Sequence, residues 1–247
     1  MTAFSLYTTM AGLQGLTARM DATAANISNA QTTGYAAVQA ATEASTYNGA
    51  NAPAGADSAA LTPGPDTSEG AITETGDPFD VAVHGNAWMQ VQTPDGTSAL
   101  TRNGSLQVNN AGILADSAGN PVLGVSGQPI SLPTLSKLEI GAAGTVSGVP
   151  ASPPGGPAQS FGQISMVATP AGYLKPLSGT LLQPPAGAVL LPDPAATMHQ
   201  GFLNGSNVDP TKSMMDMIND SRSYQLQTDM MKNQGSGTDL NALVAQG

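Results

Sequence analysis

The stretch LYTTMAGLQGLTARMDATAANI, from Leu6 to Ile27, carries an apolar or small residue at every third or fourth position. This first stripe consists of Leu6, Met10, Leu13, Thr17, Met20, Ala24 and Ile27. Steps that alternate between three and four residues place side chains on one face of a helix, so the spacing predicts a helix from about Thr2 to Asn29. Only Gly12 and Gly15 weaken its helix propensity.

A second stripe lies near the other end of the chain, in MMDMINDSRSYQLQTDMM from Met214 to Met231. It consists of Met214, Met217, Ser221, Tyr224, Thr228 and Met231. Asp209 suits the N-cap position and Pro210 the first helical position, so a second helix is predicted to begin there. Gly235 and Gly237 are predicted to end it.

An apolar stripe of this kind, which we call a seam, remains exposed to water unless another helix covers it. We therefore expect an assembly interface made of Leu6, Met10, Leu13, Met20, Ile27, Met214, Met217, Ile218, Tyr224 and Met231. Small residues within the stripes would let helix backbones approach closely. The alternative is that both helices pack on the rest of the same chain, and periodicity by itself leaves the two interpretations open.

Between the helices, from Phe79 onward, apolar residues recur at every second position in short runs that are separated by turn residues. Thr93–Gly96, Asn109–Gly112, Ser117–Asn120 and Gly141–Gly144 are predicted turns. The predicted fold class is α+β, in which N- and C-terminal helices form a coiled-coil core domain and the centre is an antiparallel β-rich domain. The expected divisions are 1–35 (N-terminal helix), 36–75 (an extended linker with one strand), 76–200 (β-rich) and 201–247 (C-terminal helix). Residues 170–200 show no clear pattern.

Composition excludes several functions. The chain of 247 residues has 7 Lys and Arg against 17 Asp and Glu, a net charge of −10, which disfavours nucleic acid and anionic membranes as partners. It has no cysteine, so disulfides, thiol nucleophiles and Cys-ligated metals are excluded. No stretch approaches the length of a membrane span and no secretory signal is visible. We expect either a cytosolic protein or one exported with its N-terminus uncut.

Catalytic patterns are weak. His84 and His199 are the only histidines and lack partners at ligand spacing, and His84 is expected to point to solvent. The acids Asp66, Glu69, Glu74, Asp77 and Asp80 read as a solvated loop rather than a carboxylate pair across a cleft. We therefore expect no catalytic, cofactor or metal site.

Three separated segments resemble the bacterial flagellar rod and hook family. The first is Ala25–Tyr35, where Asn26, Asn29, Thr32, Gly34 and Tyr35 fit the family's N-terminal signature in register. The second runs from Thr75 to Gly85 and continues at Pro94–Gly96 and Leu100–Leu106. The third leads into the last helix and contains Gly205, Ser206, Asn207 and Val208, with Arg222 inside the helix. Residues 121–130 and Pro210 most resemble members that form the proximal rod, ahead of distal-rod members and then hook members. Trp88–Met89 departs from the family, which usually has two Phe residues there.

The resemblance implies a structural subunit that polymerises through its terminal helices with copies of itself and other rod proteins. It implies passage through the flagellar export apparatus, a place in the basal-body rod across the periplasm, and a shaft that transmits torque and encloses an export channel. It implies no cofactor, no nucleic acid and no membrane insertion. Two remote alternatives are a secreted β-rich hydrolase, which would need convergent acids in a cleft, and an adhesin, which would not need the terminal seams.

Overall fold

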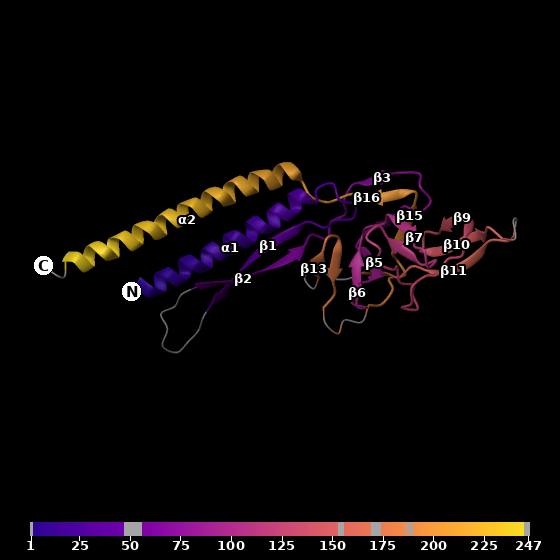
Figure 1. Cartoon of the computed structure of the whole chain (residues 1–247), viewed down its shortest axis with the longest axis horizontal. Coiled ribbons are helices and arrows are strands. Elements are labelled where there is room, and N and C mark those ends of the chain that lie inside the picture. The colour runs from indigo at the N-terminus through magenta and orange to yellow at the C-terminus, as the bar shows by residue number, and fades with distance from the viewer. Residues whose placement is uncertain are drawn as a thin grey trace. The chain divides into compact units, whose positions relative to one another are not determined.

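The chain folds into two compact units, described here from a computed structural model. The structure describes residues 2–46, 56–152, 156–168, 174–185, 187 and 190–244, and the side chains of residues 10, 12–39, 64–152, 156–168, 174–185, 187 and 190–232. The helical unit combines residues 1–28, 38–63 and 209–247, whereas the β unit combines residues 29–37 and 64–208. Both chain ends therefore belong to the same unit, as Figure 1 shows.

The helical unit is built from α1 (Thr2–Ser28) and α2 (Pro210–Val244), which confirms the two predicted helices. They run antiparallel and side by side (Figure 1). Asp209 caps α2 as expected, since its Oδ1 accepts hydrogen bonds from the backbone N–H groups of Thr211 at 2.9 Å and Lys212 at 3.1 Å. The predicted end of α2 is wrong, because the helix continues through Gly235 and Gly237. Each glycine costs about 1 kcal/mol in a helix, which is too little to stop one alone.

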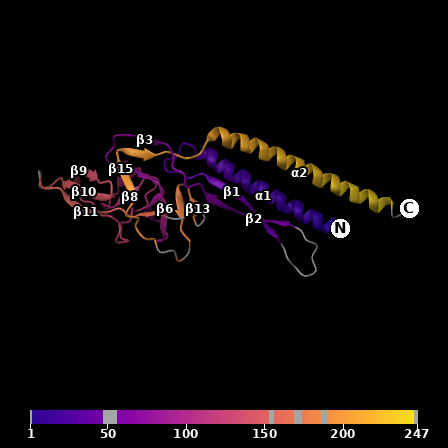
Figure 2. The same ribbon diagram turned by 180° about the vertical axis from the view of Figure 1, so that it is seen from behind.

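The predicted linker over residues 36–75 also needs correction. It contains β1 (Val38–Thr46) paired with β2 (Ala56–Pro65), and a third strand, β3 (Ile72–Glu74). Strand β1 packs on α1, and in Figure 2 the β1–β2 pair runs along the side of α1 away from α2. The segment shows no period of two because it is rich in Ala, Thr, Gly and Pro, so its pairing left no hydrophobic pattern in the sequence.

The β unit is antiparallel, as predicted. Its remaining strands are β4 (Val81–His84), β5 (Ala87–Gln92), β6 (Ser98–Thr101), β7 (Leu106–Val108), β8 (Leu114–Asp116), β9 (Leu135–Ile140), β10 (Thr145–Pro150), β11 (Gln159–Gln163), β12 (Met166–Ala168), β13 (Lys175–Ser178), β14 (Leu181–Gln183), β15 (Thr197–Gln200) and β16 (Phe202–Asn204). The largest sheet has the order β12-β5-β6-β14-β13, and a three-stranded sheet has the order β11-β10-β9. Strands β4–β15, β3–β16 and β7–β8 pair separately. Strands β13 to β15 lie within residues 170–200, a stretch whose sequence shows no clear pattern.

Strand β5 is covered on both faces and forms the centre of the core. Met89 and Val91 face one apolar cluster, and Trp88 faces a second one with Leu100 and Leu182. All five side chains are buried. Trp88 is the single tryptophan of the chain, so its environment reports on the packing of the β unit alone.

The four predicted turns are confirmed, and each contains a glycine with positive φ. Asn109 shows how such a turn is held. Its side-chain oxygen accepts hydrogen bonds from the backbone N–H groups of Ala111 and Ile113 at 2.9 and 3.0 Å. These turns set the short strand spacing that the sequence predicts for this unit.

Candidate assembly site

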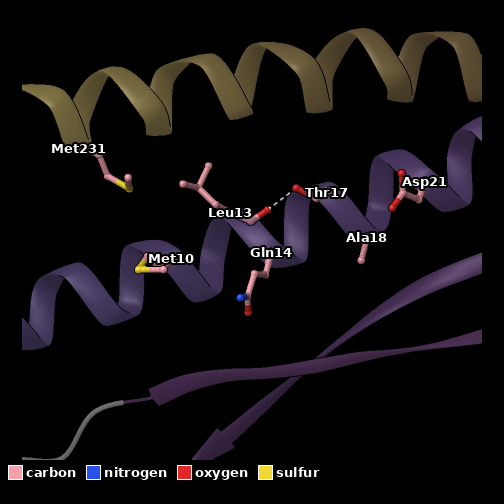
Figure 3. A pocket seen from close by; sticks show the side chains of 7 residues that line it. All are labelled: Met10, Leu13, Gln14, Thr17, Ala18, Asp21 and Met231. Carbon is pink, nitrogen blue, oxygen red and sulfur yellow. Dashed lines mark hydrogen bonds between the residues drawn. The ribbon is translucent and has the colours of Figure 1, made fainter.

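The seam between α1 and α2 is formed by two partly covered helix faces. Leu13, Met20 and Ile27 of α1 are half-buried, as are Met217 and Met231 of α2. Figure 3 shows Leu13 and Met231 pointing toward one another between the helices. Each predicted stripe therefore contributes to a contact within the chain.

The rest of the predicted interface lies at the margin of this seam. Met10, Met214 and Ile218 are 49%, 54% and 52% exposed, and Tyr224 is 38% exposed. The side chain of Leu6 lies outside the described residues. The helices thus cover part of the predicted interface and leave part of it facing solvent.

The sequence analysis missed the two residues that are buried most deeply among the described side chains of α2. These residues are Ser213 and Asp220, which are 9% and 3% exposed and stand one position before the predicted Met214 and Ser221. Spacing of three and four residues fits two sets of seam residues on α2, one with Met214 and Ser221 and one with Ser213 and Asp220, and both sets contain Met217, Tyr224 and Met231. Charge distinguishes the two sets, because Asp220 forms an ion pair with Arg19 of α1 at 2.6 Å.

The outer face of α2 carries a second set of apolar residues that the sequence analysis did not select. Met215, Leu226 and Met230 are 61%, 66% and 63% exposed. Together with Ile218 they recur at helical spacing on one face, which we call the outer stripe (Met215, Ile218, Leu226 and Met230). Arg222 of the family motif is exposed in the middle of this stripe.

An open groove of about 470 Å³ follows α1. Its lining consists of Met10, Leu13, Gln14, Thr17, Ala18, Asp21 and Met231. In Figure 3, Gln14 and Ala18 project from the side of α1 that faces away from α2. A hydrogen bond from Thr17 Oγ1 to the carbonyl oxygen of Leu13 keeps the one hydroxyl in the groove satisfied at 2.9 Å. The lining of the groove is therefore largely apolar.

The motif residues at the end of α1 organise the backbone that follows. The Asn26 side chain accepts a hydrogen bond from the Val38 N–H at 2.8 Å and donates one to the Val38 carbonyl at 2.9 Å. Thr32 closes a turn on Asn29, because its N–H and its hydroxyl donate to the backbone and side-chain oxygens of Asn29. These contacts give Asn26, Asn29 and Thr32 structural roles.

Two structural features require glycine at position 34. Its φ is +70°, and a Cβ there would overlap the backbone of Arg102 and Asn103. The next residue, Tyr35, is 6% exposed. Burial raises the pKa of the Tyr35 hydroxyl, and a hydrogen bond with Asn29 partly lowers it again. The segment after α1 is thus seated in the β unit by close backbone contact.

Two asparagines near the C-terminal side hold the β unit together. Asn204 is buried, and its carboxamide accepts a hydrogen bond from the Val83 N–H at 2.8 Å and donates to the Val83 carbonyl at 3.0 Å. Asn207 accepts from the Ala37 N–H at 2.6 Å and donates to the carbonyls of Asp66 and Ser68, each at 3.0 Å. We call these two carboxamides the backbone clamps.

The other residues of the family motif over residues 205–208 support the backbone clamps. Gly205 donates its N–H to the Ala71 carbonyl at 2.8 Å, and a Cβ on Gly70 would overlap the Gly205 carbonyl. Ser206 accepts a hydrogen bond from the Val208 N–H at 3.3 Å. The motif therefore marks a place where backbones cross closely.

Arg102 lies within Leu100–Leu106, one of the stretches that resemble the flagellar family, and it is buried and makes many contacts. Its guanidinium donates to the carbonyl oxygens of Ala87, Gly85, Thr67 and Ser68 at 2.7 to 3.2 Å. It also lies 4.1 Å from the ring centre of Trp88, a cation–π distance. Burial lowers the pKa of Arg102, while the charges of Glu69 and Asp66 raise it. A lone arginine beside a strand gives no sequence signal for such a role.

The two histidines and one of the acids considered for chemistry lie near one another. His84 is exposed, as expected, and its Nδ1 is 3.0 Å from Oε1 of Glu69, while the ring centre of His199 lies 6.3 Å from that of His84. Within the described part of the chain, no group of three or more His, Asp or Glu residues could hold a metal ion. No described helix combines the length and apolarity needed to cross a membrane.

A helical pair made from both ends of the chain, with a clamped antiparallel β unit between them in sequence, defines a two-part α+β structural protein. Comparison with known families gives three matches. Residues 6–35 match the model "Flagella basal body rod protein", residues 82–148 match "Flagellar hook protein FlgE/F/G D1 domain", and residues 199–236 match "Flagellar basal body rod FlgEFG protein C-terminal".

Curated relatives match along almost the whole length. The flagellar basal-body rod protein FlgF of Salmonella typhimurium is 32% identical over 246 residues, covering 96% of this chain and 97% of the relative. FlgF of Escherichia coli is 34% identical over 90% of each chain. The flagellar basal-body rod protein FlgG of Bacillus subtilis is 31% identical, covering 90% of this chain and 91% of the relative. The chain belongs to the flagellar basal-body rod protein family.

Proposed function

We propose that this chain is a structural subunit of the flagellar basal-body rod, in its proximal part. The observation that carries the proposal is the match to relatives named FlgF over 96% and 90% of the chain, at 32% and 34% identity. The fold supports it, because the three family-model matches fall on α1, on the β unit and on α2. The function is mechanical, and the family is one of structural proteins.

Assembly is proposed to use the apolar surface that α1 and α2 do not cover for one another. This surface comprises the groove along α1, the outer stripe of α2 and the predicted interface residues Met10, Met214 and Ile218. Burying the exposed part of one Leu, Ile or Met contributes roughly 1–2 kcal/mol, so a few such residues outweigh the cost of ordering two helices together. A groove on one helix and a stripe on another make a head-to-tail contact, which extends into a filament instead of closing.

In the rod, paired terminal helices would form the coiled-coil inner layer around an export channel. Leu6, Leu13, Met20, Ile27, Met217, Tyr224 and Met231 would then contribute the seam. The antiparallel arrangement of α1 and α2 supports this, because it presents both chain ends in one rod-like unit. Copies of this chain and other rod proteins would be the partners.

The backbone clamps suit a part that carries torque. The chain passes between the two units after residues 28, 37, 63 and 208. Asn207 ties together Ala37, Asp66 and its own segment, so three of the crossing segments are joined within the β unit. Load that enters along one segment is therefore shared by its neighbours through parallel hydrogen bonds.

Delivery is proposed to follow the flagellar export route, without a cleaved signal peptide, to a rod that spans the periplasm. A chain without cysteine forms no disulfide that would have to be broken before it is threaded unfolded.

The experiment that tests the function alters the apolar character of the outer stripe and leaves the fold of the isolated subunit intact. Leu226→Asp places a charge where Leu226 is 66% exposed, so the isolated subunit should keep its helix content and its Trp88 emission. In a bacterium whose own copy is deleted, the variant should fail to restore swimming and should be missing from purified basal bodies. Leu226→Met keeps an apolar side chain of similar size at the same position and should restore swimming. Full swimming with Leu226→Asp would contradict assembly through this face.

A further inference from the structure

Among the described side chains, the seam between α1 and α2 contains one buried carboxylate. The side chain of Asp220 is 4% exposed, and its Oδ1 lies 2.6 Å from Nη2 of Arg19, whose side chain is 44% exposed. Among the described side chains this is the ion pair that joins the two helices. A buried carboxylate is costly unless a cation and hydrogen bonds compensate it, so Asp220 is tolerated where Arg19 lies opposite.

A second contact lies one heptad further along both helices. Gly12 lies against the Gln227 side chain, and a Cβ at Gly12 would come within 2.5 Å of Gln227 Nε2. Seven residues separate Gly12 from Arg19, and seven separate Asp220 from Gln227. In an antiparallel pair, the two contacts therefore specify the same alignment of the helices.

The apolar part of the seam cannot specify that alignment by itself. Its residues repeat at heptad spacing, and methionine adapts to many neighbours, so a slip of one heptad would bury similar groups again. A slip of seven residues moves α2 along α1 by about 10 Å. It would place Asp220 opposite Gly12 in one direction or Asn26 in the other, and neither carries a positive charge.

We propose that the Arg19–Asp220 ion pair, supported by the Gly12–Gln227 contact, selects the register in which α1 and α2 pair. The ion pair selects the register by destabilising the alternatives, because each slipped register leaves the Asp220 carboxylate buried without its cation. Register determines which part of the outer stripe lies at the same height along the helix axis as the groove on α1. The inference concerns pairing inside one chain and does not depend on assembly into a rod.

The absence of native cysteine allows engineered disulfides to report the register. Leu16→Cys with Tyr224→Cys reports the observed alignment, since Leu16 lies between Gly12 and Arg19 on α1 and Tyr224 lies between Asp220 and Gln227 on α2. Leu16→Cys with Met217→Cys reports the slip of one heptad that places Asp220 opposite Gly12. Leu16→Cys with Met231→Cys reports the slip that places Asp220 opposite Asn26. Each pair is oxidised in the dilute full-length chain, and the intrachain product is measured on a non-reducing gel.

With Arg19 and Asp220 intact, the first pair should cross-link and the two slip pairs should give little product. Asp220→Leu removes the penalty, so the yield of at least one slip pair should rise by about tenfold relative to the first pair, which corresponds to 1.4 kcal/mol of lost discrimination. Asp229→Leu makes the same change at an exposed acid of α2 and should leave all yields unchanged. The exchange of Arg19→Asp with Asp220→Arg should restore selectivity.

Three results would overturn the proposal. The first is unchanged slip yields with Asp220→Leu when far-ultraviolet circular dichroism shows that the helices are intact. The second is failure of the first pair to cross-link in the chain with Arg19 and Asp220 intact. The third is loss of selectivity in the exchanged variant when Trp88 emission shows a folded β unit. None of these results depends on swimming, so the rod function could stand while the register proposal falls.

Discussion

Asn204→Ala should destabilise the β unit strongly for a residue that contributes no apolar packing. The carboxamide makes two hydrogen bonds, one with the N–H and one with the carbonyl of Val83, at 2.8 and 3.0 Å. Both asparagine and valine are buried, so water cannot replace the lost partner. Leaving a buried donor and a buried acceptor unpaired costs about 1–2 kcal/mol each, which predicts a loss of about 2–4 kcal/mol in the free energy of unfolding.

Trp88 makes the measurement specific to the β unit. It is the single tryptophan and is fully buried, so its fluorescence follows unfolding of this unit in urea, while circular dichroism at 222 nm mainly follows α1 and α2. With a urea m-value of about 2 kcal/mol/M, the predicted loss shifts the fluorescence midpoint down by about 1–2 M.

Asn110→Ala is the matched control, because Asn110 is an exposed asparagine in a turn of the same unit. It should change the free energy of unfolding by less than about 0.5 kcal/mol. If Asn204→Ala shifts the fluorescence midpoint no more than Asn110→Ala does, the carboxamide is not holding Val83, and the clamp reasoning fails.

Three other changes test separate features. Gly34→Ala forces a positive φ on alanine and pushes a Cβ into the backbone of Arg102 and Asn103, so the free energy of unfolding that Trp88 fluorescence reports in urea should fall by about 3 kcal/mol or more; an unchanged free energy of unfolding would contradict the close contact. Leu13→Asp places a charge in the helix seam and should abolish swimming while Trp88 emission stays native; a swimming strain would count against the seam. Tyr35 has a raised pKa in the folded chain, so its contribution to stability is complete below its ordinary pKa of 10.0 and is lost as pH rises through the folded-state value; Tyr35→Phe should flatten this fall in urea titrations above pH 10, and equal slopes would refute it.

The sequence predicted the helices and the turns well because their signals are local. Apolar spacing of three and four residues specifies a helix, and Asp209–Pro210 specifies where α2 begins. Glycine in the predicted turns likewise acts within a few residues. The motif residues Asn26, Gly34 and Asn207 were found through resemblance, since nothing in their local pattern states what they contact.

The features that the sequence did not predict depend on distant partners. Strands β1 and β2 pair without an alternating pattern, and α2 continues past two glycines that favour an end. The deeper face of α2 was misplaced by one position because Met214 looks more apolar than Ser213, whereas the choice is made by Arg19 opposite Asp220. Arg102 is buried because four carbonyl groups from separate segments converge on it, which a linear sequence does not display.

Asparagine at the clamp positions has a chemical reason that bears on how the chain matures. Val83 presents one N–H and one carbonyl to Asn204, so the clamp needs an acceptor and a donor together; aspartate lacks the donor and would bring a charge to a buried site. The contacts also join residues far apart in sequence, since Asn207 lies 170 positions from Ala37. Such contacts form late, because closing a long loop costs entropy before any bond repays it. When the chain is made or delivered N-terminus first, residues 29–37 therefore gain their last hydrogen bonds only after residues 204–207 are present. The segment just before α2 thus completes the hydrogen bonding of the segment just after α1.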